Sequence, residues 1–130
     1  MSYGKIRANF IEHNSAGSLD TSYVVNGSAK HFSRISMSGT DSITKSFNLS
    51  SVTDYGTGSA DLSYTNAFSD ANYSLSGNHN GVSGNSASTV FGHDNSGLMT
   101  TSQVNVTCFN AAAGRVDATE CSSQIWGDLA

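Results

Sequence analysis

Residues 46–76 read SFNLSSVTDYGTGSADLSYTNAFSDANYSLS. Within this stretch Ala60, Leu62 and Tyr64 alternate with polar residues, which is the period-two pattern of a half-buried β-strand. The glycines of the segment 53–58 (TDYGTG) stand where a tight hairpin turn needs a positive φ. The stretch therefore predicts two antiparallel strands joined by a tight turn, followed by the start of a third strand.

The composition of the whole chain agrees with a β-rich fold. The 130 residues contain 37% hydrophobic and 12% charged side chains and no proline, and nearly half of the residues are Ser, Thr, Asn or Gly. Such residues favour turns and solvated strand faces over helices. The regularly spaced apolar residues argue against a disordered chain. We expect one domain, residues 1–130, that is large enough to bury a core.

Further alternating or apolar segments complete the expected sheet. They are Tyr3–Ile11, residues 23–25 before the turn dipeptide Asn26-Gly27, His31–Met37, residues 73–75, Thr89–His93, Leu98–Phe109 and Cys121–Trp126. The parity of the apolar residues changes between Phe32 and Ile35, which indicates a β-bulge or an edge position. Residues 65–72 form a connection that is compatible with one helical turn capped by Ser69. Eight or nine strands without a convincing amphipathic helix predict an all-β, antiparallel β-sandwich or jelly-roll-like fold.

The two cysteines fall on the last two predicted strands. If these strands pair so that Cys108 faces Cys121, Val104 also faces Ile125, and the apolar faces of both strands agree. The two sulfurs then lie within reach of one cross-strand bond. Two interpretations stay open: a disulfide, or a pair of reduced thiols that fill the core as small apolar groups.

The sequence contains no pattern that singles out a catalytic, cofactor-binding or metal-binding residue. The four histidines are widely spaced, and none stands beside a cysteine or another histidine at ligand spacing. No calcium loop, nucleophile elbow or phosphate-binding glycine loop is present. The acidic residues stand mostly at predicted turns or on solvent faces, unlike the paired carboxylates of a glycoside hydrolase. We therefore expect no enzymatic activity and no cofactor.

Three residues are candidate contact residues for a binding partner. Tyr55 stands at the predicted tip of the central hairpin, where an aromatic side chain gains little from the core. His79 and Asn80 lie in the Gly- and Asn-rich segment 77–88, which is expected to form a long exposed loop or two short strands.

The charge distribution excludes some classes of partner. The formal net charge is −4, with an excess of basic residues before residue 46 and of acidic residues after it. No basic run resembles a nucleic-acid-binding surface. The N-terminus lacks the apolar region of a signal peptide, and no apolar stretch is long enough to span a bilayer. We expect a soluble protein that is made in the cytosol.

Several motifs resemble a family of bacteriophage tail-fibre-type virion proteins that is common in marine phages. Residues 3–8 (YGKIRA) resemble the opening of that family. Residues 47–58 (FNLSSVTDYGTG) resemble its N-V-S-S-(I/V)-T-D-N-G-T-G hairpin, and residues 62–73 (LSYTNAFSDANY) resemble its V-N-F-T-T-A-x-x-D-A-N-Y segment. The strands from Val104 onward are similar to its closing strands. The resemblance implies a β-sandwich that usually assembles as a trimer, with no catalytic residues to carry over.

These observations lead to one functional expectation and two alternatives. The leading expectation is a non-enzymatic virion structural protein of the tail-fibre type, which assembles as a homotrimer after synthesis in the host bacterial cytoplasm. Its partners would be its own copies, other virion proteins (tail, fibre or major capsid protein) and a host surface glycan. One alternative is a capsid decoration (cement) protein that stabilises the head. The other is a glycan-binding or glycan-acting jelly-roll protein.

Overall fold

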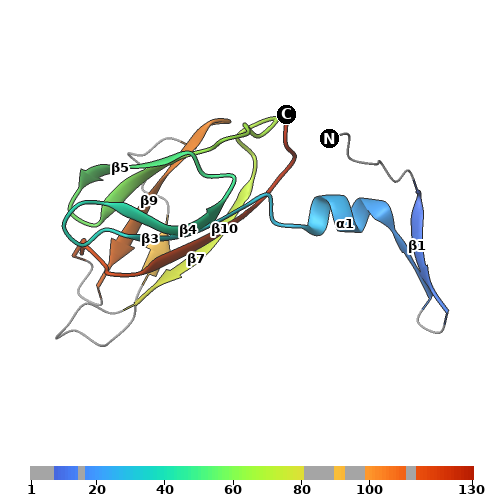
Figure 1. Cartoon of the computed structure of the whole chain (residues 1–130), viewed down its shortest axis with the longest axis horizontal. Helices are drawn as coiled ribbons and strands as arrows, with labels where there is room; N and C mark the ends of the chain where they lie inside the picture. The colour runs from blue at the N-terminus through green and yellow to red at the C-terminus, as the bar shows by residue number, and fades with distance from the viewer. Residues whose placement is uncertain (1–7, 15–16, 81–89, 93–98, 111–113) are drawn as a thin grey trace.

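The computed structural model describes residues 8–14, 17–80, 90–92, 99–110 and 114–130. Its main body is a sandwich of two four-stranded antiparallel sheets, and a small hairpin and a short helix extend from one end of it (Figure 1). The expected all-β antiparallel sandwich is therefore confirmed. No helix among these residues is long and apolar enough to cross a membrane.

Each sheet combines strands from distant parts of the chain. The first sheet has the order β4-β3-β10-β7, and its strands are β3 (His31–Ser36), β4 (Ser42–Phe47), β7 (Ser74–His79) and β10 (Cys121–Trp126). The second sheet has the order β5-β6-β9-β8, and its strands are β5 (Ser51–Gly56), β6 (Ser59–Ser63), β8 (Val90–Gly92) and β9 (Gln103–Phe109). The described part of the sandwich thus holds eight strands, which agrees with the expected eight or nine.

The central hairpin expected from the sequence is strands β5 and β6, paired from Ser51↔Ser63 to Gly56↔Ser59. The side chains of Ala60, Leu62 and Tyr64 are buried, as their alternation predicted. A positive φ at both Gly56 and Gly58 closes the turn. Because β6 also pairs with β9, the hairpin forms half of the second sheet.

The core lies between the two sheets and ends in an aromatic cluster. Branched residues from both sheets, including Ile35, Leu62 and Ile125, have at most 1% of their surface exposed. At the end of the sandwich, Phe68 packs against Tyr64 with ring centroids 4.9 Å apart and against Tyr73 at 4.7 Å. These contacts fix the connection between β6 and β7.

That connection is not helical, contrary to the proposed turn capped by Ser69. The Ser69 amide instead donates to the carbonyl of Asp128, and Phe68 forms a β-bridge with Leu129. The C-terminal segment therefore holds Phe68 and Ser69 in a non-helical conformation. A local cap is too weak to compete with two tertiary backbone contacts and the burial of Phe68.

Strand β3 shows the predicted irregularity in its pairing with β4 rather than in its own alternation. His31, Ser33 and Ile35 all face the core, and Phe32 faces outward, so β3 alternates regularly. The irregularity lies in the pairing with β4, where the partner moves from Lys45 to Ile43 between Arg34 and Ile35. This register shift agrees with the β-bulge predicted between Phe32 and Ile35.

Residues 21–27 form a helix that the sequence analysis did not predict. Helix α1 (Thr21–Gly27) includes the apolar run 23–25, and Asn26-Gly27 ends it rather than turning a hairpin. The carboxylate of Asp20 caps the helix by accepting a hydrogen bond from the Ser22 amide at 2.7 Å. An N-cap satisfies an otherwise unpaired amide and thus favours the helical form.

The remaining strand bounds differ from expectation at their ends. Strand β1 (Phe10–His13) pairs with β2 (Gly17–Asp20), whereas the expected first strand 3–11 lies partly outside the described residues. Strand β9 begins at Gln103 because the Thr100 hydroxyl accepts from the Gln103 amide in a tight turn. Residues 81–88 of the predicted loop also lie outside the described residues.

Candidate functional site

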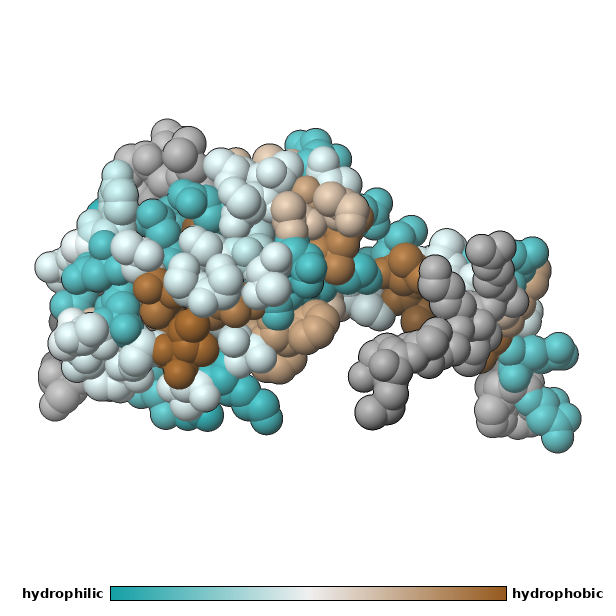
Figure 2. Space-filling model, turned by 45° about the horizontal axis from the view of Figure 1, so that its top comes forward, coloured by the Kyte–Doolittle hydropathy of each residue, from teal (hydrophilic) through white to brown (hydrophobic). Residues whose placement is uncertain are grey.

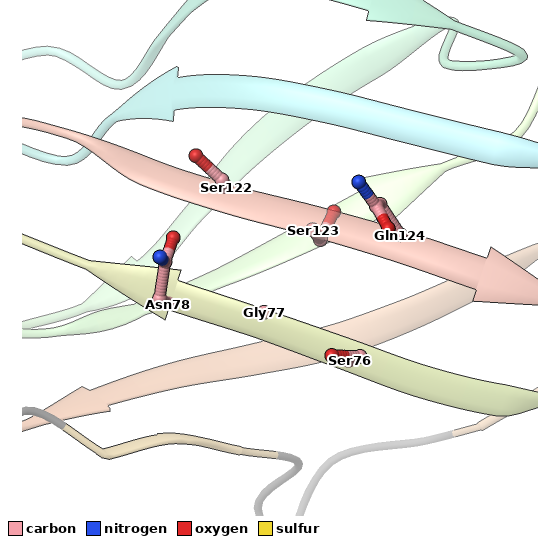
Figure 3. A pocket seen from close by; sticks show the side chains of 6 residues that line it. All are labelled: Ser76, Gly77, Asn78, Ser122, Ser123 and Gln124. Carbon is pink, nitrogen blue, oxygen red and sulfur yellow. The ribbon is translucent and has the colours of Figure 1, made fainter.

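A shallow polar groove runs along β7 and β10 on the outer face of the first sheet (Figure 3). Its volume is about 180 Å³, and it is lined by Ser76, Gly77, Asn78, Ser122, Ser123 and Gln124. The two strands pair there as Ser122↔Asn78, Ser123↔Gly77 and Gln124↔Ser76. Gly77 contributes no side chain to this surface.

The groove offers hydroxyl and amide groups and no charged side chain. Ser76, Asn78, Ser122 and Gln124 are all exposed, whereas Ser123 points into the core. Hydroxyl and carboxamide groups both donate and accept hydrogen bonds. The groove is therefore suited to a neutral ligand rich in hydroxyl or amide groups.

A second groove of about 310 Å³ adjoins the first and shares Asn78 and Ser122 with it. Its remaining lining residues are Arg34, His79, Asn80 and Glu120. Arg34 and Glu120 form an ion pair across it, with both side chains about half exposed. An exposed pair of this kind contributes little to stability but places both charges at the surface.

The structure brings two of the predicted contact residues, His79 and Asn80, into this second groove. The His79 ring is 6% exposed, and its nitrogens lie 2.8 Å from the carbonyl oxygen of Asn80 and 3.1 Å from that of Phe109. The Asn80 amide oxygen accepts from the Glu120 amide at 3.0 Å and from the Thr119 hydroxyl. Both side chains thus hold the end of β7 in place, and their polar atoms are engaged within the protein.

Tyr55, the third predicted contact residue, lies apart from the other two in the fold. It is 59% exposed on β5, which is the edge strand of the second sheet, whereas His79 belongs to the first sheet. Its position near the hairpin tip agrees with the sequence analysis.

The predicted pairing of the last two strands is wrong, yet the cysteines do meet. Strand β9 pairs with β6 and β8, and β10 pairs with β3 and β7, so the two strands belong to different sheets. Cys108 and Cys121 face each other across the core, both free and buried, with their Sγ atoms 3.2 Å apart. The hydrogen bond to Cys121 and burial raise the pKa of the Cys108 thiol. Of the two interpretations, the structure contains the reduced thiols.

A buried polar network that the sequence analysis missed lies beside the core of the first sheet. His31 is fully buried, with one ring nitrogen 3.2 Å from the Ser123 hydroxyl and the other 3.3 Å from the carbonyl of Asn48. The Ser123 hydroxyl is in turn 2.7 Å from that of Ser33. Burial lowers the pKa of His31. The sequence does contain a signal for this network: His31 and Ser33 have the same parity as Ile35 in β3, and all three side chains face inward.

The carboxylate of Asp41 lies within the electrostatic influence of two other carboxylates, those of Asp54 and Asp117. Burial raises the pKa of Asp41 to about 6, and the charges of Asp54 and Asp117 contribute. One carboxylate oxygen of Asp41 has no hydrogen-bond partner in the described structure. Within the described ranges, no group of three His, Cys, Asp or Glu side chains is arranged to hold a metal ion.

Comparisons of the chain with protein-family models, curated proteins and solved structures found no match. A relationship to phage fibre proteins therefore rests on the resemblance of the sequence motifs alone.

Proposed function

We propose that this chain is a non-enzymatic structural and binding protein of a bacteriophage virion, of the tail-fibre type, that works as a homotrimer. The observation that supports the proposal is that reactive side chains of the protein are buried while apolar side chains are exposed. Among the described residues, the reactive side chains of His31, Cys108 and Cys121 are enclosed in the core. Apolar side chains instead reach the surface, both on the sandwich and on the part that projects from it (Figure 2).

The surface of the sandwich supports a role in contact rather than in chemistry. Its strand faces carry serine, asparagine and glutamine, which form polar and hydrated contacts with partners. The rigid two-sheet core presents these groups at fixed positions. Such a module binds by its surface, and the motif resemblance of residues 47–58 and 62–73 favours a phage particle as its location.

The position of the protein on the particle is tested by deletion of its gene. A tail-fibre-type protein predicts particles that withstand heating as well as the parent but adsorb poorly to the host. Particles that adsorb normally but break at lower temperature would identify a capsid decoration protein instead. Antibody labelling of intact particles locates the protein directly, and particles without label would contradict the proposal.

A glycan-binding role is the second candidate, and the groove between β7 and β10 favours it. Its uncharged hydroxyl and amide lining matches the donors and acceptors of a neutral polysaccharide. Binding to a glycan array that Gln124→Ala and Asn78→Ala abolish would support this role. Thr65→Ala is the matched control, since Thr65 is exposed and lies outside the groove. Cleavage of the glycan would contradict the non-enzymatic assignment.

A further inference from the structure

The described residues 8–14 and 17–27 form a projecting arm, and none of them contributes to a buried core. It consists of the hairpin β1–β2 and helix α1, and no residue of the helix is buried. The Thr21 hydroxyl donates to the carbonyls of Ala8 and Asn9, and the Thr21 amide also donates to that of Asn9, so these bonds join the hairpin to the start of the helix. A two-stranded hairpin and a helix of two turns are each marginal in water. The arm therefore requires a surface to pack on.

The side chains of the arm show what kind of surface that is. Phe10 and Tyr23 are 60% and 70% exposed, and further apolar side chains of the arm are also exposed: Ile11, Leu19, Val24 and Val25. The arm points away from its own sandwich (Figure 1), so the sheets of the same copy do not cover these residues. A partner surface has to be apolar to bury them.

The sandwich carries such a surface on the outer face of β3 and β4. Phe32 and Phe47 are cross-strand neighbours whose rings stack with centroids 6.0 Å apart and planes inclined by 20°. They are 39% and 53% exposed. Because β4 is the edge strand of its sheet, a second molecule can reach both rings. Exposed aromatic pairs of this kind are typical centres of protein interfaces.

The charges of the two surfaces are complementary. Between Ala8 and Gly27 the sequence contains Glu12 and Asp20 and no lysine or arginine. The Phe32–Phe47 pair is bordered by Arg34 and Lys45, which are neighbours across the same two strands. Arg34 is paired with Glu120, so Lys45 supplies the positive charge of this face. Two arms that packed on each other would bring their acidic residues together, whereas an arm on the Phe32–Phe47 face brings acidic and basic residues together.

We infer that the arm of one copy docks on the Phe32–Phe47 face of a second copy of this chain. The inference deepens the proposed homotrimeric assembly by naming the surfaces that meet. It concerns the isolated protein in solution, so its test is independent of where the protein lies on a phage particle.

Complementation between two defective variants tests the inference. Phe10→Ser with Tyr23→Ser weakens the arm, and Phe32→Ser with Phe47→Ser weakens the face. Light scattering over a concentration series should show each variant dissociating at a concentration at least about tenfold higher than the parent. An equimolar mixture should recover part of the assembly, because the intact arm of one variant meets the intact face of the other. Tyr55→Ser, an exposed aromatic change on the other sheet, is the control and should assemble as the parent does.

A charge exchange tests the same contact without removing apolar groups. Glu12→Lys and Lys45→Glu should each weaken assembly by roughly two- to fivefold, and the double variant should restore it. Assembly that survives the face variant but not the arm variant means that arms pack on each other and overturns the inference. Assembly that survives both variants overturns it too, while the proposed trimer stands. A parent protein that is monomeric at all concentrations contradicts both.

Discussion

The Sγ atoms of Cys108 and Cys121 lie 3.2 Å apart although their strands belong to different sheets. The two sheets are therefore in contact through this pair, near the end of β9 and the start of β10. Both thiols are enclosed by the core, with at most 1% of either residue exposed. Because the packing of the two sheets sets the distance between the sulfurs, it also decides whether the two cysteines can form a disulfide.

The two thiols should be unreactive toward alkylating reagents as long as the protein is folded. Only a thiolate reacts rapidly, and the hydrogen bond to Cys121 together with burial raises the pKa of Cys108. In reducing buffer, iodoacetamide should label neither cysteine at pH 8, whereas the same protein in urea should gain two labels by mass spectrometry. Rapid labelling of the folded protein would contradict the buried arrangement.

Oxidation of the pair should stabilise the protein. The cysteines are 13 positions apart in the sequence, and closing a loop of this size is worth about 3 kcal/mol in the chain-entropy description. Refolding in a mixture of oxidised and reduced glutathione should produce a disulfide and raise the free energy of unfolding measured in urea. Reduction of the same sample is the control and should return the original value. A less stable oxidised form would show that the bond distorts the packing of the sheets.

The two glycines of the central hairpin should respond differently to alanine. A Cβ at Gly58 would lie 2.5 Å from the backbone nitrogen of Val116 and 2.9 Å from the carbonyl oxygen of Cys108, whereas a Cβ at Gly56 would meet open space. Both residues have a positive φ, so Gly56→Ala reports the backbone strain alone, about 1 kcal/mol. Gly58→Ala should cost at least about 2 kcal/mol more, since backbone atoms have to move. Equal losses in urea denaturation would contradict this packing.

His31 should make the protein lose stability as the pH drops from 7.5 to 5. Burial lowers the pKa of His31 in the folded protein, so the unfolded chain binds a proton near its ordinary value of 6.5 while the folded chain does not. In His31→Gln the decline should be shallower. The other three histidines are unchanged in this variant, so the difference between the two slopes reports His31. Identical slopes would show that His31 takes up protons equally in both states.

Asp41 should contribute a slope of the opposite sign over a pH range that overlaps that of His31. Its pKa is raised to about 6 in the fold, chiefly by burial, so the unfolded chain loses this proton more readily. The contribution of Asp41 to stability therefore decreases as the pH rises from about 4 to above 6. Asp41→Asn should stabilise the protein more at pH 7.5 than at pH 4, as measured by thermal unfolding at both values. A uniform effect at both pH values would exclude a raised pKa as the cause.

The parts of the fold that were predicted correctly depend on short-range patterns. Strand β10 has the expected bounds, Cys121–Trp126, and its inward residues alternate as expected. The hairpin around Gly58 was predicted because positive φ and period-two alternation are readable within about ten residues. Helix α1 was missed because its decisive feature is one capping carboxylate, Asp20, beside an apolar run that is equally compatible with a strand.

The candidate site could be predicted only in fragments. His79 and Asn80 were selected for their loop-like composition, but their hydrogen bonds to Phe109, Thr119 and Glu120 depend on strands that meet in space. The groove beside Gln124 was not predicted, because its lining comes from β7 and β10, which are more than 40 residues apart in the chain. Neither strand alone contains a signal for it.

The sequence by itself determined that this protein is an antiparallel β-structure with a closed apolar core and a polar surface, since alternation and turn residues act locally. The tertiary structure decided which strands pair. It placed Cys108 opposite Cys121 across the sandwich rather than along a hairpin, left Phe32 and Phe47 stacked on an open face, and set an apolar arm outside the core. The physical reason is that period-two patterns fix which face of a strand is buried, whereas the choice of neighbour depends on how all the buried faces fill one core together.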